Sequence, residues 1–251
     1  MGCGDLPAYF LRRRIPVINL KSDDWPRAIA QTGISEPQTA VCLQRLSARG
    51  RVSRIRRNLY LVVDPVREAP VESVASACFS HLDHYVTTDR ALVFHRLIDQ
   101  PTPAITVVTA ESRAIGLRVR GLEIRSVYMP ASRLQRASQE NYYSTTSDGY
   151  PVVIATRALA VADALAHPSW MTHYSLLPEV VSAFSARDLS VLSRLCLDRS
   201  RAAAQRLGYL LEEAGIDAPP ELAAFHPVSA VYLDPRHRRA GLFSTRWMTR
   251  G

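Results

Sequence analysis

The chain has 251 residues, and 47% of them are hydrophobic, which is enough for one large domain or two modest domains and excludes a globally disordered protein. Its net charge is +8, and residues 1–60 hold +7 of it, because Lys21 and ten arginines there outnumber four acidic residues. Such a concentration of positive charge indicates a polyanionic partner for this region.

The first 33 residues predict two helices separated by a short strand. We expect a helix over residues 6–14, a strand over 15–20, a helix over 22–30 and a turn at 32–33. Arg12, Arg13 and Arg14 end the first helix. They could contact phosphates, and a solvated helix end explains them equally well.

Residues 35–49 predict a further helix whose two faces differ. Ser35 is a good N-cap because its hydroxyl can accept a hydrogen bond from the first turn, and Gly50 ends the helix. The face expected to pack on a core carries Thr39, Cys42, Leu43 and Leu46. The opposite face carries Gln38, Val41, Gln44 and Arg45.

A basic hairpin is predicted over residues 51–63. Val52 and Ile55 lie among arginines, and Asn58 tolerates the left-handed conformation of a tight turn. The order helix, strand, helix, turn, helix, hairpin is that of a winged helix-turn-helix, which places one helix in the major groove and the hairpin on a neighbouring groove or backbone. The predicted DNA-binding residues are Ser35, Gln38, Val41, Gln44, Arg45, Arg51, Arg54, Arg56, Arg57 and Asn58.

A second, larger domain is predicted after the hairpin. Two prolines and mixed charge make residues 65–70 a linker between a domain of residues 1–64 and one of residues 71–251. The predicted elements are helices over 71–82 and 88–97, a strand over 104–109, a hairpin over 117–129, a strand over 152–155, and helices over 157–166, 176–184, 188–197 and 201–214. The fold class is therefore α+β, with a helical C-terminal half.

The cysteines and histidines are the residues that could form a disulfide or a metal site. The four cysteines are widely spaced, so neither a zinc site nor a disulfide framework is expected, and Cys42 and Cys196 should be small core residues. His81 and His84 share a helical face, but no carboxylate–histidine motif accompanies them or His95, which favours ordinary polar or capping histidines over a metal site.

Asp163 lies among alanines on a predicted helix, where a buried carboxylate needs a partner. Arg157 or Arg206 could supply it, and a structural ion pair is favoured over an acid–base role.

No enzymatic or cofactor site is predicted. Lys21 is the only lysine, so a P-loop lysine, a Schiff-base lysine or a Glu-x-Lys nuclease motif is excluded after residue 60, and no nucleophile elbow or dinucleotide-binding glycine motif occurs. The N-terminus lacks the order of a secretory signal, and no apolar run could span a bilayer. We expect a cytoplasmic protein without a membrane partner.

Several motifs together resemble the AbiEi family of antitoxins from type IV toxin–antitoxin and abortive-infection (phage-defence) systems. They are LSARGRVSRIRRNLYLV at 46–62, YVTTDRALVFHRLIDQ at 85–100, ITVVT at 105–109, the helix around 158–165, RLGYLLEEAG at 206–215, and the closing LDP, Gly241 and RW at 233–247. Asn58 stands where the family commonly has glycine.

The resemblance implies a bifunctional protein. Its winged helix would repress its own promoter at inverted repeats of double-stranded DNA, and its C-terminal domain would counter a nucleotidyltransferase-like toxin, directly or indirectly. An alternative is a winged-helix transcriptional regulator whose second domain senses a ligand. A nuclease fused to a DNA-binding domain is disfavoured, because the second domain has no lysine.

Overall fold

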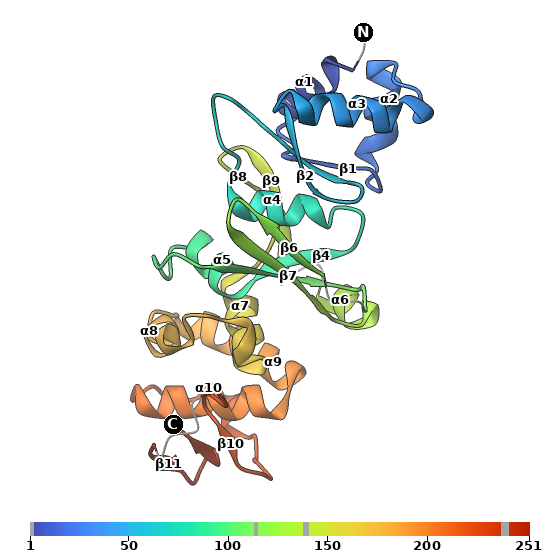
Figure 1. Cartoon of the computed structure of the whole chain (residues 1–251). Coiled ribbons are helices and arrows are strands. Elements are labelled where there is room, and N and C mark those ends of the chain that lie inside the picture. The colour runs from blue at the N-terminus through green and yellow to red at the C-terminus, as the bar shows by residue number, and fades with distance from the viewer. Residues whose placement is uncertain (1–2, 113–114, 138–140, 237–240) are drawn as a thin grey trace. The chain divides into compact units, whose positions relative to one another are not determined.

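The computed structural model describes residues 3–112, 115–137, 141–236 and 241–251 (Figure 1). Helices and strands are mixed along the chain, so the predicted α+β class is confirmed. The chain forms two compact units, one of residues 1–86 and 107–154 and one of residues 87–106 and 155–251. No helix within the described ranges is both long and apolar enough to cross a bilayer.

The N-terminal part of the first unit has the predicted element order. Its elements are α1 (Asp5–Arg12), β1 (Val17–Asn19), α2 (Asp24–Thr32), α3 (Glu36–Ala48), β2 (Val52–Arg56) and β3 (Leu59–Val62). Gly33 and Gly50 have φ values of 67° and 66° at the ends of α2 and α3, the left-handed region that glycine enters without a steric penalty. This is the winged helix-turn-helix that the sequence predicts.

A small sheet and the three helices enclose one core. The strands lie in the order β1-β3-β2, with both neighbouring pairs antiparallel. Phe10, Ile18, Leu43 and Val52 bring an apolar side chain from α1, β1, α3 and β2 into this core. Burial of one face of every element fixes which face of α3 remains at the surface.

The rest of the first unit is built on a larger sheet. Its elements are α4 (Val71–Cys78), β4 (His84–Thr87), β5 (Ala104–Thr109), β6 (Gly116–Val119), β7 (Leu122–Tyr128), α6 (Ala131–Ala137), β8 (Tyr142–Ser147) and β9 (Tyr150–Ala155), with the strands in the order β6-β7-β5-β4-β9-β8. The predicted strand at 104–109 and hairpin at 117–129 are confirmed. Strand β8 was not predicted, and the ring of Tyr142 stacks on Tyr85 at 4.7 Å.

The second unit is mainly helical, as predicted for the C-terminal half. Its elements are α5 (Thr88–Phe94), α7 (Arg157–Ala166), short 3₁₀ turns at Pro168–Trp170 and Tyr174–Leu176, α8 (Leu177–Ser182), α9 (Ala186–Arg199), α10 (Arg201–Glu213), α11 (Pro220–Ala223), β10 (Val231–Tyr232), β11 (Phe243–Ser244) and β12 (Thr249–Arg250). Thr156 caps α7 by accepting a hydrogen bond from the Leu159 amide, and α7 covers the helix predicted over residues 157–166.

The predicted boundary at residues 65–70 does not coincide with a limit of the compact units. Contacts inside the first unit cross it: the Asn19 amide donates to the Cys78 carbonyl at 3.3 Å, and Arg14 donates to the Asp148 carbonyl at 3.0 Å. The separate folding of residues 1–64 therefore stays a prediction.

Asp163 has a structural ion pair, and the arginine in it is Arg199, which the sequence did not predict. Its Oδ1 lies 3.0 Å from Nε of Arg199, both side chains are buried, and Thr87 donates a 2.8 Å hydrogen bond to the other carboxylate oxygen. Arg157 instead pairs with Asp188, and Arg206 donates to backbone carbonyls. Asp163 lies on α7 and Arg199 lies at the end of α9, two α-helices later in the chain. The spacing of residues within one helix cannot predict such a pairing.

Both ring nitrogens of buried His84 are used. Nδ1 lies 2.8 Å from the Leu82 carbonyl, which only accepts, so Nδ1 carries the proton. Nε2 then accepts from the Ser76 hydroxyl at 2.8 Å, while the Val153 amide donates to that hydroxyl. Burial lowers the pKa of His84, so the neutral ring is the stable form in the folded protein.

Asp163→Asn should destabilise the protein by about 3–5 kcal/mol, because it removes the negative charge from a buried ion pair with Arg199. Denaturant unfolding followed by circular dichroism measures the destabilisation. Asp198→Asn, at an exposed site one residue before Arg199, is the matched control and should change stability by less than about 0.5 kcal/mol. Equal midpoints for the two variants would contradict the assignment.

Acid should destabilise the fold through its histidines. Burial lowers the folded-state pKa of His84, His81 and His95 below the ordinary value, so the unfolded chain binds protons first as the pH falls. The stability is therefore complete above the unfolded pKa of about 6.5 and declines below it. Unfolding titrations at about pH 7.5 and about pH 5.5 measure the decline, and His84→Gln should make it smaller. An identical decline in both proteins would show that His84 does not contribute.

Candidate nucleic-acid interface

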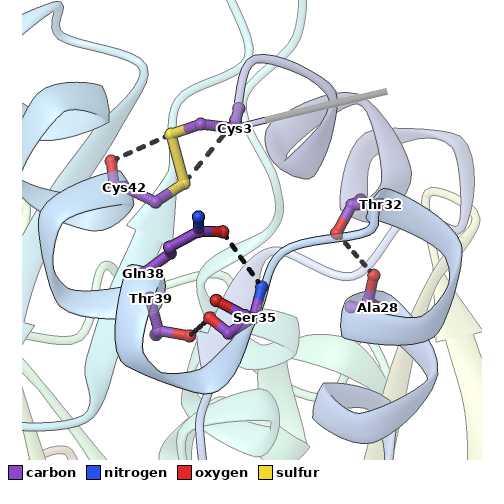
Figure 2. Close-up of a disulfide and its surroundings, with 7 residues drawn as sticks. All are labelled: Cys3, Ala28, Thr32, Ser35, Gln38, Thr39 and Cys42. Atoms are coloured by element: carbon purple, nitrogen blue, oxygen red, sulfur yellow. Dashed lines mark hydrogen bonds between the residues drawn. A yellow bond between two sulfur atoms is a disulfide. The ribbon is translucent and has the colours of Figure 1, made fainter.

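Helix α3 begins with a reciprocal cap. Ser35 is the N-cap, and its backbone amide donates to the Oε1 atom of Gln38 at 3.3 Å, while its side chain faces the amide of residue 38. The buried Thr39 donates a hydrogen bond from its hydroxyl to the Ser35 carbonyl at 3.4 Å (Figure 2). The cap satisfies orphan donors of the first turn and fixes where the exposed face of α3 starts.

The face of α3 that was predicted to meet DNA is at the surface. Gln38, Val41, Gln44 and Arg45 are all exposed, with 48% of Val41 accessible, whereas Cys42, Leu43 and Leu46 are buried. A chain of 13 residues makes a helix of about 20 Å, long enough to lie in a major groove. The arrangement offers amide groups, one aliphatic side chain and one guanidinium on a single face.

The β2–β3 hairpin forms a short basic wing. Asn58 has a φ of 66°, confirming the predicted left-handed turn, and the register shifts between Arg54 and Arg56. Arg54 and Arg57 are exposed and Arg56 is half-buried. Within the described part of the chain, none of the side chains of these three arginines makes a hydrogen bond or ion pair, so their charges remain available to an anion.

Two further basic residues flank this surface. Arg49, at the C-cap of α3, and Lys21, after β1, are exposed, and neither was among the predicted contacts. One feature of the sequence indicates that Lys21 could be a functional residue, because it is the only lysine of the chain. Arg14 is not available in the same way: it donates to the Asp148 carbonyl and lies over the ring of Tyr150.

A disulfide ties α3 to the start of the chain, contrary to the prediction that none would form. Cys3 and Cys42 are joined with their Cα atoms 5.4 Å apart, and Figure 2 shows the bond between the start of the chain and α3, further along the helix than Ser35. Cys42 is buried as predicted, but it is not a free thiol. A separation of 39 residues gave no spacing signal, because only the fold brings the two sulfurs together.

The disulfide closes a loop around α1 and α2. In the chain-entropy description, a loop of this length stabilises the folded state by about 4 kcal/mol. Each sulfur also lies near the backbone carbonyl of the other cysteine, at 3.3 Å and 3.8 Å. If the disulfide were reduced, each thiol could donate a hydrogen bond to that carbonyl. The other two cysteines, Cys78 and Cys196, are buried free thiols, and burial raises the pKa of Cys78 to about 12, which makes it unreactive.

Two of the histidines considered for a metal site contact protein groups. Nδ1 of His81 lies 3.0 Å from the Asn19 amide nitrogen, and Nε2 of His95 lies 2.8 Å from the Ala155 carbonyl. No group of three or more potential ligands gathers within the described residues.

Comparison with known proteins bears on the fold alone. No protein-family model matches the chain, and no curated protein matches its sequence. The crystal structure of the RV2827C protein from Mycobacterium tuberculosis is similar, with a TM-score of 0.61 over 98% of this chain and 90% of that chain, at 14% sequence identity. Likeness at that level of identity shows a shared architecture.

Proposed function

We propose that the chain is a DNA-binding antitoxin that represses its own promoter and counters a nucleotidyltransferase-like toxin, without being an enzyme itself. The observation that carries the DNA-binding half is the exposed face of α3 beside a wing whose arginines have no partner among the described residues. The antitoxin half rests on the resemblance of the sequence to the AbiEi family.

The division of contacts follows from side-chain chemistry. Arg54, Arg56 and Arg57 suit phosphates or a minor groove, since guanidinium groups bind phosphate through paired charge-assisted hydrogen bonds. Gln44 suits an adenine edge in the major groove, where a side-chain amide pairs with N6 and N7. Arg45 lies late in α3, a position that more often meets a phosphate.

Gln38 is a less simple base contact than Gln44. Its Oε1 atom already accepts the Ser35 amide in the cap, so pairing with adenine through both amide atoms competes with that bond. Gln44 makes no such contact among the described residues and can use both atoms. We therefore assign base recognition to Gln44 first and to Gln38 second.

The toxin-facing half has a surface that fits a protein partner. In the second unit, Val228 and Leu242 are each 75% exposed, and Tyr232 and Phe243 on β10 and β11 are also exposed. Tyr232 and Phe243 both pair with Arg250 of β12, and Leu242 precedes Phe243, so these three side chains belong to one small sheet. Exposed apolar side chains that lie close together commonly mark an interaction site. We place contact with the toxin there.

The proposed location is the cytoplasm, and it changes the state expected of the disulfide. Cytosolic glutathione and thioredoxin keep most thiols reduced. The Cys3–Cys42 pair would then be one half-buried and one buried thiol that donate to the neighbouring carbonyls, and α3 would keep its cap and its buried face.

One observation favours a second candidate function, a winged-helix regulator that senses a small ligand. A cavity of about 580 Å³ lies beside the tip of the wing. A ligand there would act on DNA binding rather than replace it.

Gln44→Ala should reduce affinity for the promoter by about 1–3 kcal/mol and change affinity for random DNA little, because only base recognition is removed. Fluorescence anisotropy with both DNAs measures the difference. Gln31→Ala, an exposed glutamine on α2, is the matched control and should bind as the unaltered protein does. An equal effect of Gln44→Ala on both DNAs would refute its role in base recognition.

Replacing Arg54, Arg56 and Arg57 together by alanine should weaken binding to both DNAs about 10-fold or more and reduce the salt slope by about one for each phosphate that is no longer bound.

Two full-length variants should separate the two activities. The first variant combines Leu242→Arg with Phe243→Arg. It should no longer rescue cells that express a nucleotidyltransferase-like toxin from the gene next to this one, because charge is placed in an apolar contact. Its binding to the promoter should stay intact. The wing variant should do the reverse. Growth with an induced toxin and anisotropy on the promoter measure the two effects. Rescue by both variants would contradict the proposed toxin surface, and absence of rescue by the unaltered protein would favour the ligand-sensing regulator.

A further inference from the structure

The cavity beside the wing is lined by three different parts of the first unit. The wing supplies Arg56 and Arg57, the residues after β1 supply Lys21, and the connections next to α4 and β6 supply His81 and Glu111. Its volume of about 580 Å³ falls within the range of sites for small molecules. Nothing in the predicted DNA contact requires an open pocket of this size beside the wing.

The charges around this cavity are not balanced. Lys21, Arg56 and Arg57 are cationic, and Glu111 is the acidic residue among the described lining residues. None of the four side chains makes a hydrogen bond or ion pair with another described residue. Unpaired guanidinium and ammonium groups around a pocket are the usual means of holding a phosphate.

Asn19 orients a further donor toward the same space. The side-chain amide of Asn19 donates both to the Cys78 carbonyl and to Nδ1 of His81, at 3.3 Å and 3.0 Å. A ring that accepts at Nδ1 carries its proton on Nε2, which leaves that N–H able to donate. Burial first, then the charge of Lys21, lowers the pKa of His81, which keeps the ring neutral.

We propose that this cavity binds a small phosphorylated molecule of about mononucleotide size, and that the bound molecule competes with DNA for Arg56 and Arg57. The phosphate would lie between the two arginines and Lys21, with His81 donating through Nε2. Glu111 would accept from a hydroxyl or amino group of the organic part, and the half-buried Ile115 offers it apolar surface.

The competition rests on the proposed function, since it requires that the wing contacts DNA. The binding site does not rest on it. A ligand that occupies Arg56 and Arg57 removes two cations from the wing, and affinity for DNA falls with each phosphate that the wing no longer binds. The chain would then bind its promoter less tightly when the phosphorylated molecule is abundant.

Isothermal titration calorimetry on the full chain tests the site, with inorganic pyrophosphate and adenosine monophosphate as probes. Sulfate and adenosine at the same ionic strength are the comparators. We expect one molecule bound per chain, at least about 10-fold more tightly than sulfate, because several charge-assisted hydrogen bonds form. Binding of neither probe above sulfate would overturn the proposal.

Variants locate the bound probe. Arg57→Ala and Lys21→Ala alter exposed residues that line the cavity and should each weaken binding about 10-fold, as should Arg56→Ala, which alters a half-buried residue. Arg54→Ala is the matched control, because Arg54 is an exposed wing arginine outside the cavity. Equal effects of Arg54→Ala and Arg57→Ala would place the anion on the outer surface of the wing and overturn the proposal.

A promoter titration with saturating probe tests the competition. The dissociation constant for DNA should rise with pyrophosphate and stay unchanged with sulfate at equal ionic strength, and unchanged affinity with both would overturn the competition. Should the chain bind no DNA, the proposed function fails, whereas the calorimetric titration still decides whether the cavity is a phosphate site.

Discussion

The side chain of Asn19 is the contact on which the arrangement of the first unit depends. It is only 2% exposed, its amide nitrogen donates to Cys78 and His81, and its oxygen accepts from the Lys21 amide at 3.0 Å. One residue at the end of β1 therefore links the winged-helix sheet to α4 and to the residues after it. Because β1 pairs with β3 of the wing, this link also sets where the wing lies beside the cavity.

The same link explains why the first unit combines two regions that the sequence separates. A buried amide deprived of its partners would cost about 1–3 kcal/mol, so the winged helix is held to α4 by more than chain connectivity. The charge is distributed differently: almost all of the excess lies in residues 1–60, on α3, the wing and their surroundings. The proposed DNA-binding surface can thus be continuous in charge while its scaffold extends past residue 64.

The sequence predicted what depends on neighbouring residues and missed what depends on distant ones. Caps, glycine stops and periodicity are local signals, which is why α3, the wing turn at Asn58 and β5 were predicted correctly. Strand β8 was missed because its YYSTTS segment is half exposed and polar, without the alternation of a buried strand. Pairings between distant residues were also missed, because only the fold brings those residues together. They include Cys3 with Cys42, Asp163 with Arg199 and Asn19 with His81. The exposed face of α3 could be predicted, and the cavity behind the wing could not.

We propose above that α3 and the wing bind a specific DNA sequence. The affinity of the intact protein for the DNA upstream of its own gene tests this, measured against salt concentration and against random DNA of equal length. We expect binding at least about 1,000-fold tighter to the upstream DNA, with log K falling linearly as log salt rises. Equal affinity for the two DNAs, or no binding to either at low salt, would contradict it.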